Sequence, residues 1–203
     1  MAIELRKGNK VILEKKSVSL GEILVNLNWN HGGGRGKTGF FASLSRGGKG
    51  VDLDLGCLYE LKSGQKGCVQ ALGKAFGNYQ APPYISLDGD DRTGESTEGE
   101  TLRINGTMIA QITRILVYTF IYEGVANWQQ VDGVVRLSYP GSDDIIVRMD
   151  EYGSAKTLCG IALLENQHNE TFSVEKVVQF YDSQRYLDQA FGWGMEWHSG
   201  TKN

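Results

Sequence analysis

A two-sheet β-sandwich, mainly all-β with long loops and a short C-terminal helix, is the fold class that the sequence predicts. Three observations support this prediction: short apolar runs, turn signals that bound each run, and 27 glycines among 203 residues. At least eight such runs follow one another at short spacing, which is typical of sandwiches. The length suits one ordinary domain, so we expect a single domain over residues 1–203.

The runs that predict strands are spread along the chain. Residues 23–30 (ILVNLNWN) are apolar at every odd position, which is the period of a half-buried strand. Residues 51–59 (VDLDLGCLY) alternate in the same way, which places Asp52 and Asp54 on one face. Residues 115–122 (ILVYTFIY) are apolar on both faces, as expected of a central strand. Further strands are expected over residues 134–139, 145–149, 158–164 and 174–181.

The C-terminal region changes its period. Asp182 or Ser183 is expected to cap a helix that ends at Gly192. Bulky side chains then alternate, and we expect them to pack back on the sandwich as core or packing residues: Trp193, Met195 and Trp197. We read the other two tryptophans, Trp29 and Trp128, in the same way, because no basic stripe accompanies them. Nucleic acid is therefore not an expected partner.

Cysteine usage and apolar run lengths indicate the compartment. The three cysteines, Cys57, Cys68 and Cys159, form an odd set without a CxxC pair, which favours neither a disulfide framework nor a thiolate zinc site. We expect buried thiols in a reducing environment. The first residues contain no signal-like apolar region, and no apolar run reaches the length of a membrane span. The sequence thus predicts a cytoplasmic protein, and peripheral contact with a membrane stays open.

An acidic segment over residues 88–100 (DGDDRTGESTEGE) contains six carboxylates and one arginine, with three glycines among them. Calcium takes about six to eight oxygen ligands, and glycines let the backbone curl so that its carbonyls also point inward. Crowded carboxylates would repel one another without a cation, so a hard divalent ion is the natural partner. An EF-hand is excluded, because Arg92 occupies the fifth position and Gly99 the twelfth. The alternative is a solvated acidic loop without a ligand.

Two of these motifs resemble a known family. Residues 50–55 (GVDLDL) resemble the DLD strand of the tellurium-resistance TerD family, and residues 89–95 (GDDRTGE) resemble its GDNRTGE loop. Residues 192–197 (GWGMEW) look like the ending of the TerA-like branch of that family. The resemblance covers nearly the whole chain.

The resemblance implies a calcium-binding stress-response protein, not an enzyme, that acts as a binding or scaffold module whose acidic loop is ordered by Ca2+. It also implies other tellurium-resistance family proteins as partners. The sequence departs from the family where Asp91 replaces the usual Asn and where residues 96–100 read STEGE, so the choice between one ion and two stays open. The candidate ligands, two of them (Asp88 and Glu98) added from the acidic segment itself, are Asp52, Asp54, Asp88, Asp90, Asp91, Glu95, Glu98 and Glu100.

A glycine-rich segment over residues 31–50 supports the alternative function, a nucleotide-binding or magnesium-dependent enzyme. Its start, HGGGRGKT, differs from the phosphate-binding GxxxxGK[ST] pattern because His31 stands at the first glycine. A phosphate loop must also begin a helix, and Arg46 with two glycines follows too soon for one. The histidines have no zinc-triad spacing, and no serine lies in a GxSxG elbow. Direct tellurite chemistry through the cysteines lacks an activating neighbour.

Overall fold

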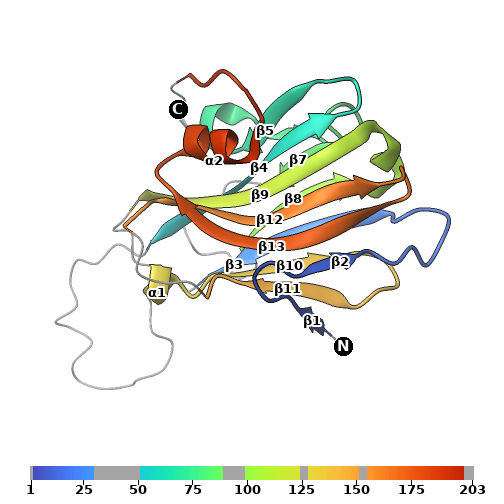
Figure 1. Ribbon diagram of the computed structural model, residues 1–203, viewed down its shortest axis with the longest axis horizontal. Coiled ribbons are helices and arrows are strands. Elements are labelled where there is room, and N and C mark those ends of the chain that lie inside the picture. Colours follow the sequence, from blue (N-terminus) through green and yellow to red (C-terminus); the bar gives the residue numbers. More distant parts are fainter. Residues whose placement is uncertain (1, 30–50, 89–98, 124–127, 151–154, 199–203) are drawn as a thin grey trace.

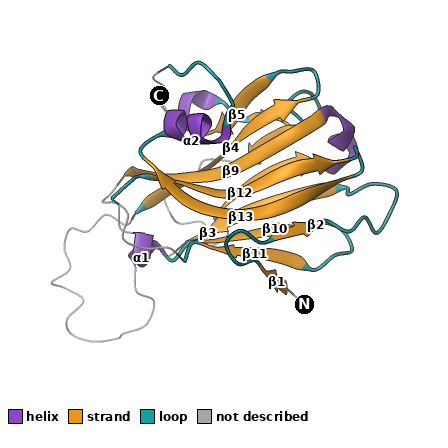
Figure 2. Cartoon of the chain, in the orientation of Figure 1, coloured by secondary structure: helices purple, strands orange, loops and turns teal. Residues whose placement is uncertain are grey.

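The computed structural model describes residues 2–29, 51–88, 99–123, 128–150 and 155–198. Most of these residues are in strands, as Figure 2 shows. The strands are β1 (Ala2–Glu4), β2 (Lys10–Ile12), β3 (Glu22–Asn28), β4 (Asp52–Leu61), β5 (Lys66–Gln70), β6 (Gly77–Asn78), β7 (Ile85–Asp88), β8 (Glu100–Asn105), β9 (Ile112–Glu123), β10 (Val134–Ser138), β11 (Asp144–Arg148), β12 (Leu158–Gln167) and β13 (Thr171–Tyr181). The helices are two short 3-10 turns (Leu72–Lys74 and Gly106–Gln111), α1 (Trp128–Val131) and α2 (Gln184–Phe191).

Within the described ranges the strands form two sheets that pack face to face, which confirms the predicted sandwich (Figure 1). One sheet has seven strands in the order β1-β11-β10-β3-β8-β7-β6. The other has six, in the order β2-β13-β12-β9-β4-β5. The pairing of β1 with β11 is parallel, whereas the other strand pairs are antiparallel. The first two strands therefore tie the N-terminal region to both sheets.

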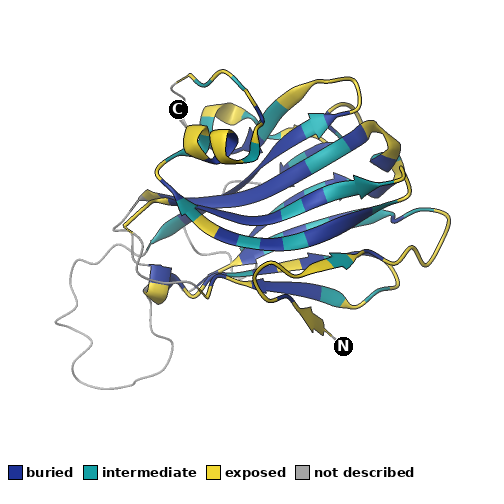
Figure 3. Ribbon diagram, viewed as in Figure 1, coloured by how far each residue is buried: buried dark blue, intermediate teal, exposed yellow. Residues whose placement is uncertain are grey.

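The core lies between the sheets, and Figure 3 shows the buried residues concentrated along the middle strands. β9 pairs with β12 on one side and β4 on the other, so the strand predicted to be central is central. β3 alternates between buried and half-exposed residues, as the sequence predicts for a half-buried strand. β4 is buried on both faces from Leu53 to Tyr59, because its outer face is covered as well.

The outer face of the six-stranded sheet is covered by the C-terminal region. Ser183 stands at the N-cap of α2, although its side chain makes no capping hydrogen bond, and Gly192 ends the helix in the left-handed conformation, as expected. The side chain of Trp193 is fully buried, and its Nε1 donates a hydrogen bond to the backbone oxygen of Tyr59 on β4 at 3.0 Å. Beneath it lies an apolar cluster that includes Leu58, Leu116 and Tyr118. The prediction that the tail packs back on the sandwich is thus confirmed.

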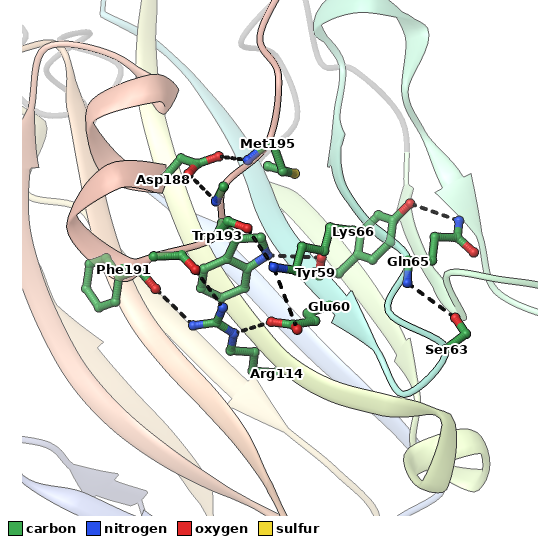
Figure 4. A network of polar contacts seen from close by, with 12 residues as sticks. Tyr59, Glu60, Ser63, Gln65, Lys66, Arg114, Asp188, Phe191, Trp193 and Met195 are labelled. Carbon is green, nitrogen blue, oxygen red and sulfur yellow. Dashed lines mark hydrogen bonds and ion pairs between the residues drawn. The ribbon is translucent and has the colours of Figure 1, made fainter.

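Polar contacts hold the tail in place, and Figure 4 shows their arrangement. Arg114 on β9 lies over the Trp193 ring at 3.8 Å from its centroid and donates to the backbone oxygens of Phe191 and Gly192. Asp188 accepts hydrogen bonds from the backbone nitrogens of Gly194 and Met195 at 2.7 and 2.9 Å. These contacts satisfy the backbone groups that follow the helix, so the tail has one defined path.

Cysteine burial corrects one expectation. Cys57 and Cys159 are buried free thiols, as predicted, but Cys68 is only partly buried. Cys68 lies on β5, the edge strand of its sheet, where the C-terminal tail leaves one side accessible. None of the helices in the described part of the chain is long and apolar enough to cross a membrane.

Candidate metal site

Several strand ends meet at one end of the sandwich, where the acidic residues were predicted to gather (Figure 1). Leu27, near the end of β3, opposes Glu100, the first residue of β8. The first residue of β4, Asp52, opposes Glu123 at the end of β9. Because Asn28 also opposes Val134 on β10, the starts of β4, β8 and β10 share this end with the termini of β3 and β9.

Glu100 links the two sheets at this end. It is the first residue of β8, its side chain faces inward and the residue is 2 % exposed. Its Oε2 accepts a hydrogen bond of 2.5 Å from the backbone nitrogen of Leu55 on β4. The β4–β5 pairing ends at Gly56 and Gln70, one residue after Leu55. The Glu100 carboxylate therefore binds a backbone N–H of β4 that β5 does not reach. The end of the acidic segment therefore contacts the DLD strand directly.

Asp54 precedes Leu55 and is fully buried. Its backbone oxygen accepts a hydrogen bond from Thr119 Oγ1 on β9 at 2.9 Å. Its Oδ2 atom is enclosed and receives no hydrogen bond, although the residue has other interactions. The pKa of Tyr118 is raised well above its usual value, first by burial and then by nearby thiols and the Asp54 carboxylate. Asp54 opposes Phe120 and shares its face of β4 with Leu58, in the cluster under the C-terminal tail, whereas the side chain of Glu100 points between the sheets.

Asp54 and Glu100 are buried carboxylates on β4 and β8, strands of different sheets, and burying each is costly unless something compensates its charge. Each buried anion loses the hydration that it has in the unfolded chain, and neutral hydrogen bonds return only part of it. Carboxylate oxygens are the donors that a hard divalent cation prefers. The donor chemistry of Asp54 and Glu100 therefore fits calcium.

The other predicted ligands are not all brought to this point. Asp52 is partly exposed, and the β4–β9 register shifts between Asp52 and Leu53, so the simple alternation predicted for this strand is irregular at its start. Asp88 is exposed at the end of β7 and lies 3.7 Å from the guanidinium of Arg103. Arg103 and Asp88 belong to the outer face of the seven-stranded sheet, whereas Glu100 faces inward. The structure does not place Asp88 beside Asp54 and Glu100.

Four predicted ligands lie outside the described residues: Asp90, Asp91, Glu95 and Glu98. The same holds for most of the glycine-rich segment, residues 31–50. Among the residues that the structure describes, no three His, Cys, Asp or Glu side chains form a group that could hold a metal ion. A complete calcium site would therefore need ligands from residues 89–98 in addition to Asp54 and Glu100.

Supporting residues at this end include Trp29, whose packing role the sequence predicted, and Asn26 and Thr119, which the sequence reasoning missed. Trp29 is buried at the end of β3, and its Nε1 donates to the backbone oxygen of Val51 at 3.1 Å, which fixes the start of β4. Asn26 Nδ2 donates to Thr101 Oγ1 at 3.0 Å beside Glu100. The sequence could have indicated Thr119 as a supporting residue. Apart from Tyr118, it carries the one hydroxyl among the apolar residues 115–121 of the predicted central strand.

The fold and the sequence together define the class of protein. The family model described as the TerD domain matches residues 1–183, and the chain belongs to this family. Over 200 residues the chain is 44% identical to the "Tellurium resistance protein TerA" of Alcaligenes sp, which agrees with the TerA-like features of its ending. That match covers 98% of this chain and 58% of the relative, so the chain spans little more than half of the relative's length.

Two solved structures share the fold. The crystal structure of a protein of unknown function, SAV2460, superposes with a TM-score of 0.57 at 14% identity, covering 87% of this chain and 99% of the other. A homologue of telluride resistance protein (TerD), SCO6318 from Streptomyces coelicolor A3(2), gives a TM-score of 0.53 at 16% identity, covering 83% and 95%. At such identities the similarity establishes the sandwich fold alone.

Proposed function

We propose that this chain is a calcium-binding stress-response protein of the tellurium-resistance family that acts as a binding or scaffold module. In this proposal Ca2+ orders the acidic segment over residues 88–100 and so creates the surface that a partner contacts. The contact between Glu100 Oε2 and the Leu55 backbone nitrogen carries the proposal, because it joins the end of that segment to the strand that holds Asp54.

The charge balance supports this reading. Asp54 and Glu100 are 0% and 2% exposed, and Glu100 ends a segment that contains five further carboxylates. A cation held there would offset the repulsion among these groups and would be bound by the folded chain alone. One ion or two are compatible with the number of carboxylates. In this proposal the oxygen ligands of the ion come from residues 89–98 together with Asp54 and Glu100.

Linkage between binding and stability provides the test. A ligand that binds only the folded state raises the free energy of unfolding by about 2.7 kcal/mol at a hundred times its Kd. For a domain of about 200 residues this corresponds to a rise in Tm of about 5–10 °C. We expect calcium to produce this rise, a chelator to reverse it, and isothermal titration to show saturable heat.

Two variants make the test specific. Asp54→Asn keeps the shape of a buried side chain but removes one charge, and we expect it to weaken calcium binding at least about tenfold. Glu170→Gln removes an exposed carboxylate from the loop between β12 and β13 and should leave the affinity unchanged. Saturating calcium that produces neither heat nor a Tm shift in the unmodified chain would leave only a solvated acidic loop.

We propose a non-catalytic role in the cytoplasm, with other tellurium-resistance family proteins as partners and with peripheral membrane contact as an open alternative. Replacing Lys37 by Ala separates this role from nucleotide chemistry in the glycine-rich segment. Calcium affinity should survive the substitution, whereas a nucleotide-dependent enzyme would lose nucleotide binding.

A further inference from the structure

A pocket of about 530 Å3 lies between β5 and the C-terminal tail, on the covered side of the six-stranded sheet. Its size is within the range of small-molecule sites. The tail supplies about half of its lining, so the pocket exists only because the segment after residue 183 packs on the domain. Its lining includes Cys68, Gln70, Leu72, Gln184, Met195 and Trp197.

Gln70 forms the polar floor of this pocket. It is only 7% exposed, and its Oε1 accepts hydrogen bonds from Tyr118 Oη at 2.5 Å and from Gln184 Nε2 at 3.4 Å. Two donors on one oxygen fix the orientation of the Gln70 amide. Its Nε2 donates no hydrogen bond to a described residue and is not among the fully enclosed polar atoms, so it opens into the pocket that Gln70 lines.

Gln184 adds an acceptor beside this donor. It stands at the first position of α2, lines the same pocket and uses its Nε2 to reach Gln70. Its Oε1 accepts no hydrogen bond from the described residues. The two linked amides therefore present an N–H donor and a C=O acceptor to one cavity. A ligand that carries a complementary acceptor and donor would form a hydrogen bond with each amide.

The walls beside the two amides are apolar, whereas the charged or titratable side chains of the lining, Lys66, Glu196 and His198, are exposed. Trp197 is held by a hydrogen bond from its Nε1 to Asp188 Oδ2 at 2.9 Å, so its ring is fixed beside Met195 and Leu72. Burial raises the pKa of the Cys68 thiol, which is therefore neutral at neutral pH. Lys66 Nζ is engaged by the backbone oxygen of Trp193 at 2.7 Å. A neutral, flat ligand suits these walls better than an anion does.

We propose that this pocket binds a neutral, planar small molecule whose ring carries a lactam edge, that is, an adjacent N–H donor and C=O acceptor. The lactam oxygen receives the Gln70 amide N–H, and the lactam N–H donates to Gln184 Oε1. The ring lies between the apolar side chains of the tail and of β5. This site is distinct from the acidic segment and from the proposed calcium function.

The first test compares 2-pyridone with N-methyl-2-pyridone, which has the same ring but no lactam N–H. Saturation-transfer NMR on the full chain should show 2-pyridone binding in the millimolar range expected of so few atoms. We expect N-methyl-2-pyridone to bind about tenfold more weakly, because Gln184 Oε1 then loses its donor. Equal signals for the two probes, or none for either, would overturn the proposal.

Variants assign the effect to the two amides. Gln184→Leu lies at the partly exposed start of α2, should fold normally by far-UV circular dichroism, and should remove the preference for 2-pyridone. Gln70→Leu should remove binding of 2-pyridone altogether. Gln179→Leu changes an exposed glutamine on β13 and should alter neither. A retained preference in Gln184→Leu would contradict the assignment.

Cys68 supplies an independent readout. It lines the pocket and is the most accessible of the three cysteines, because Cys57 and Cys159 are fully buried. Iodoacetamide should therefore modify Cys68 first in the native chain. Saturating 2-pyridone should slow this modification severalfold, whereas N-methyl-2-pyridone at the same concentration should protect much less. Unchanged modification under saturating 2-pyridone would show that the probe does not occupy this pocket.

Discussion

Replacing Trp193 by Ala should destabilise the protein strongly, because one side chain carries much of the contact between the tail and the sandwich. Its indole is fully buried, its Nε1 donates to the Tyr59 backbone oxygen at 3.0 Å, and Arg114 lies over its ring. Truncating a buried tryptophan to alanine costs about 3–5 kcal/mol in free energy of unfolding. For about 200 residues this predicts a fall in Tm of about 6–20 °C.

Calorimetry or urea unfolding measures the loss, and amide hydrogen exchange localises it. The backbone nitrogens of Gly194 and Met195 are bonded to Asp188 and should lose their protection in Trp193→Ala. Trp193→Phe keeps an aromatic ring but removes the N–H and part of the ring volume, so it should cost about 1–3 kcal/mol, less than Trp193→Ala.

Tyr186→Ala, which removes a half-exposed ring from α2, is the matched control and should change stability by less than about 0.5 kcal/mol. A loss below about 1 kcal/mol in Trp193→Ala, with Gly194 and Met195 still protected, would refute the reasoning.

Three further predictions concern other contacts. Glu100→Gln should keep stability but weaken calcium binding, whereas Glu100→Ala should lower the free energy of unfolding by about 1–3 kcal/mol, because the Leu55 N–H loses its acceptor. Burial raises the pKa of the Asp150 carboxyl, but hydrogen bonds from the buried Lys176 ammonium outweigh burial and lower this pKa overall, so stability should fall as the pH drops below about 4. Asp150→Asn should flatten that part of the pH profile. Gly56→Ala should destabilise the chain by about 1–3 kcal/mol, because its Cβ would lie 2.8 Å from a buried tyrosine ring. Thermal or urea unfolding checks each variant.

The long apolar strands could be predicted from the sequence because their signal is local. The alternation in β3 and the apolar run of β9 each specify their own burial. Ser183 and Gly192 mark the ends of α2 for the same reason. The strands β1, β2, β6, β7 and β8 were not predicted. Four of them have only two to four residues, which carry too little periodicity, and their conformation depends on pairing with distant strands.

Features that depend on contacts between distant residues could not be predicted. Lys176 reads as a surface lysine on an alternating strand, yet its side chain is 1% exposed and pairs with Asp150, which follows β11 of the other sheet. The inward orientation of Glu100 follows from its place opposite Leu27, which only the assembled sheet determines. The donor–acceptor pair of Gln70 and Gln184 likewise requires the tail to be docked.

The sequence predicted which carboxylates belong to the candidate site, and the structure brings only some of them to the same end of the sandwich. The acidic composition of residues 88–100 and the DLD strand indicated carboxylates close together, and Glu100 does contact the strand of Asp54. The orientation of Asp88 toward Arg103 could not be read from the sequence, because it depends on which face of β7 the residue occupies.

A crystal structure of the chain with saturating calcium tests the central claim most directly. The account predicts calcium density at the shared end of β4 and β8, with oxygens of Asp54, Glu100 and the segment over residues 89–98 at about 2.3–2.6 Å. Density elsewhere, or none near Asp54 and Glu100 at saturating calcium, would contradict it.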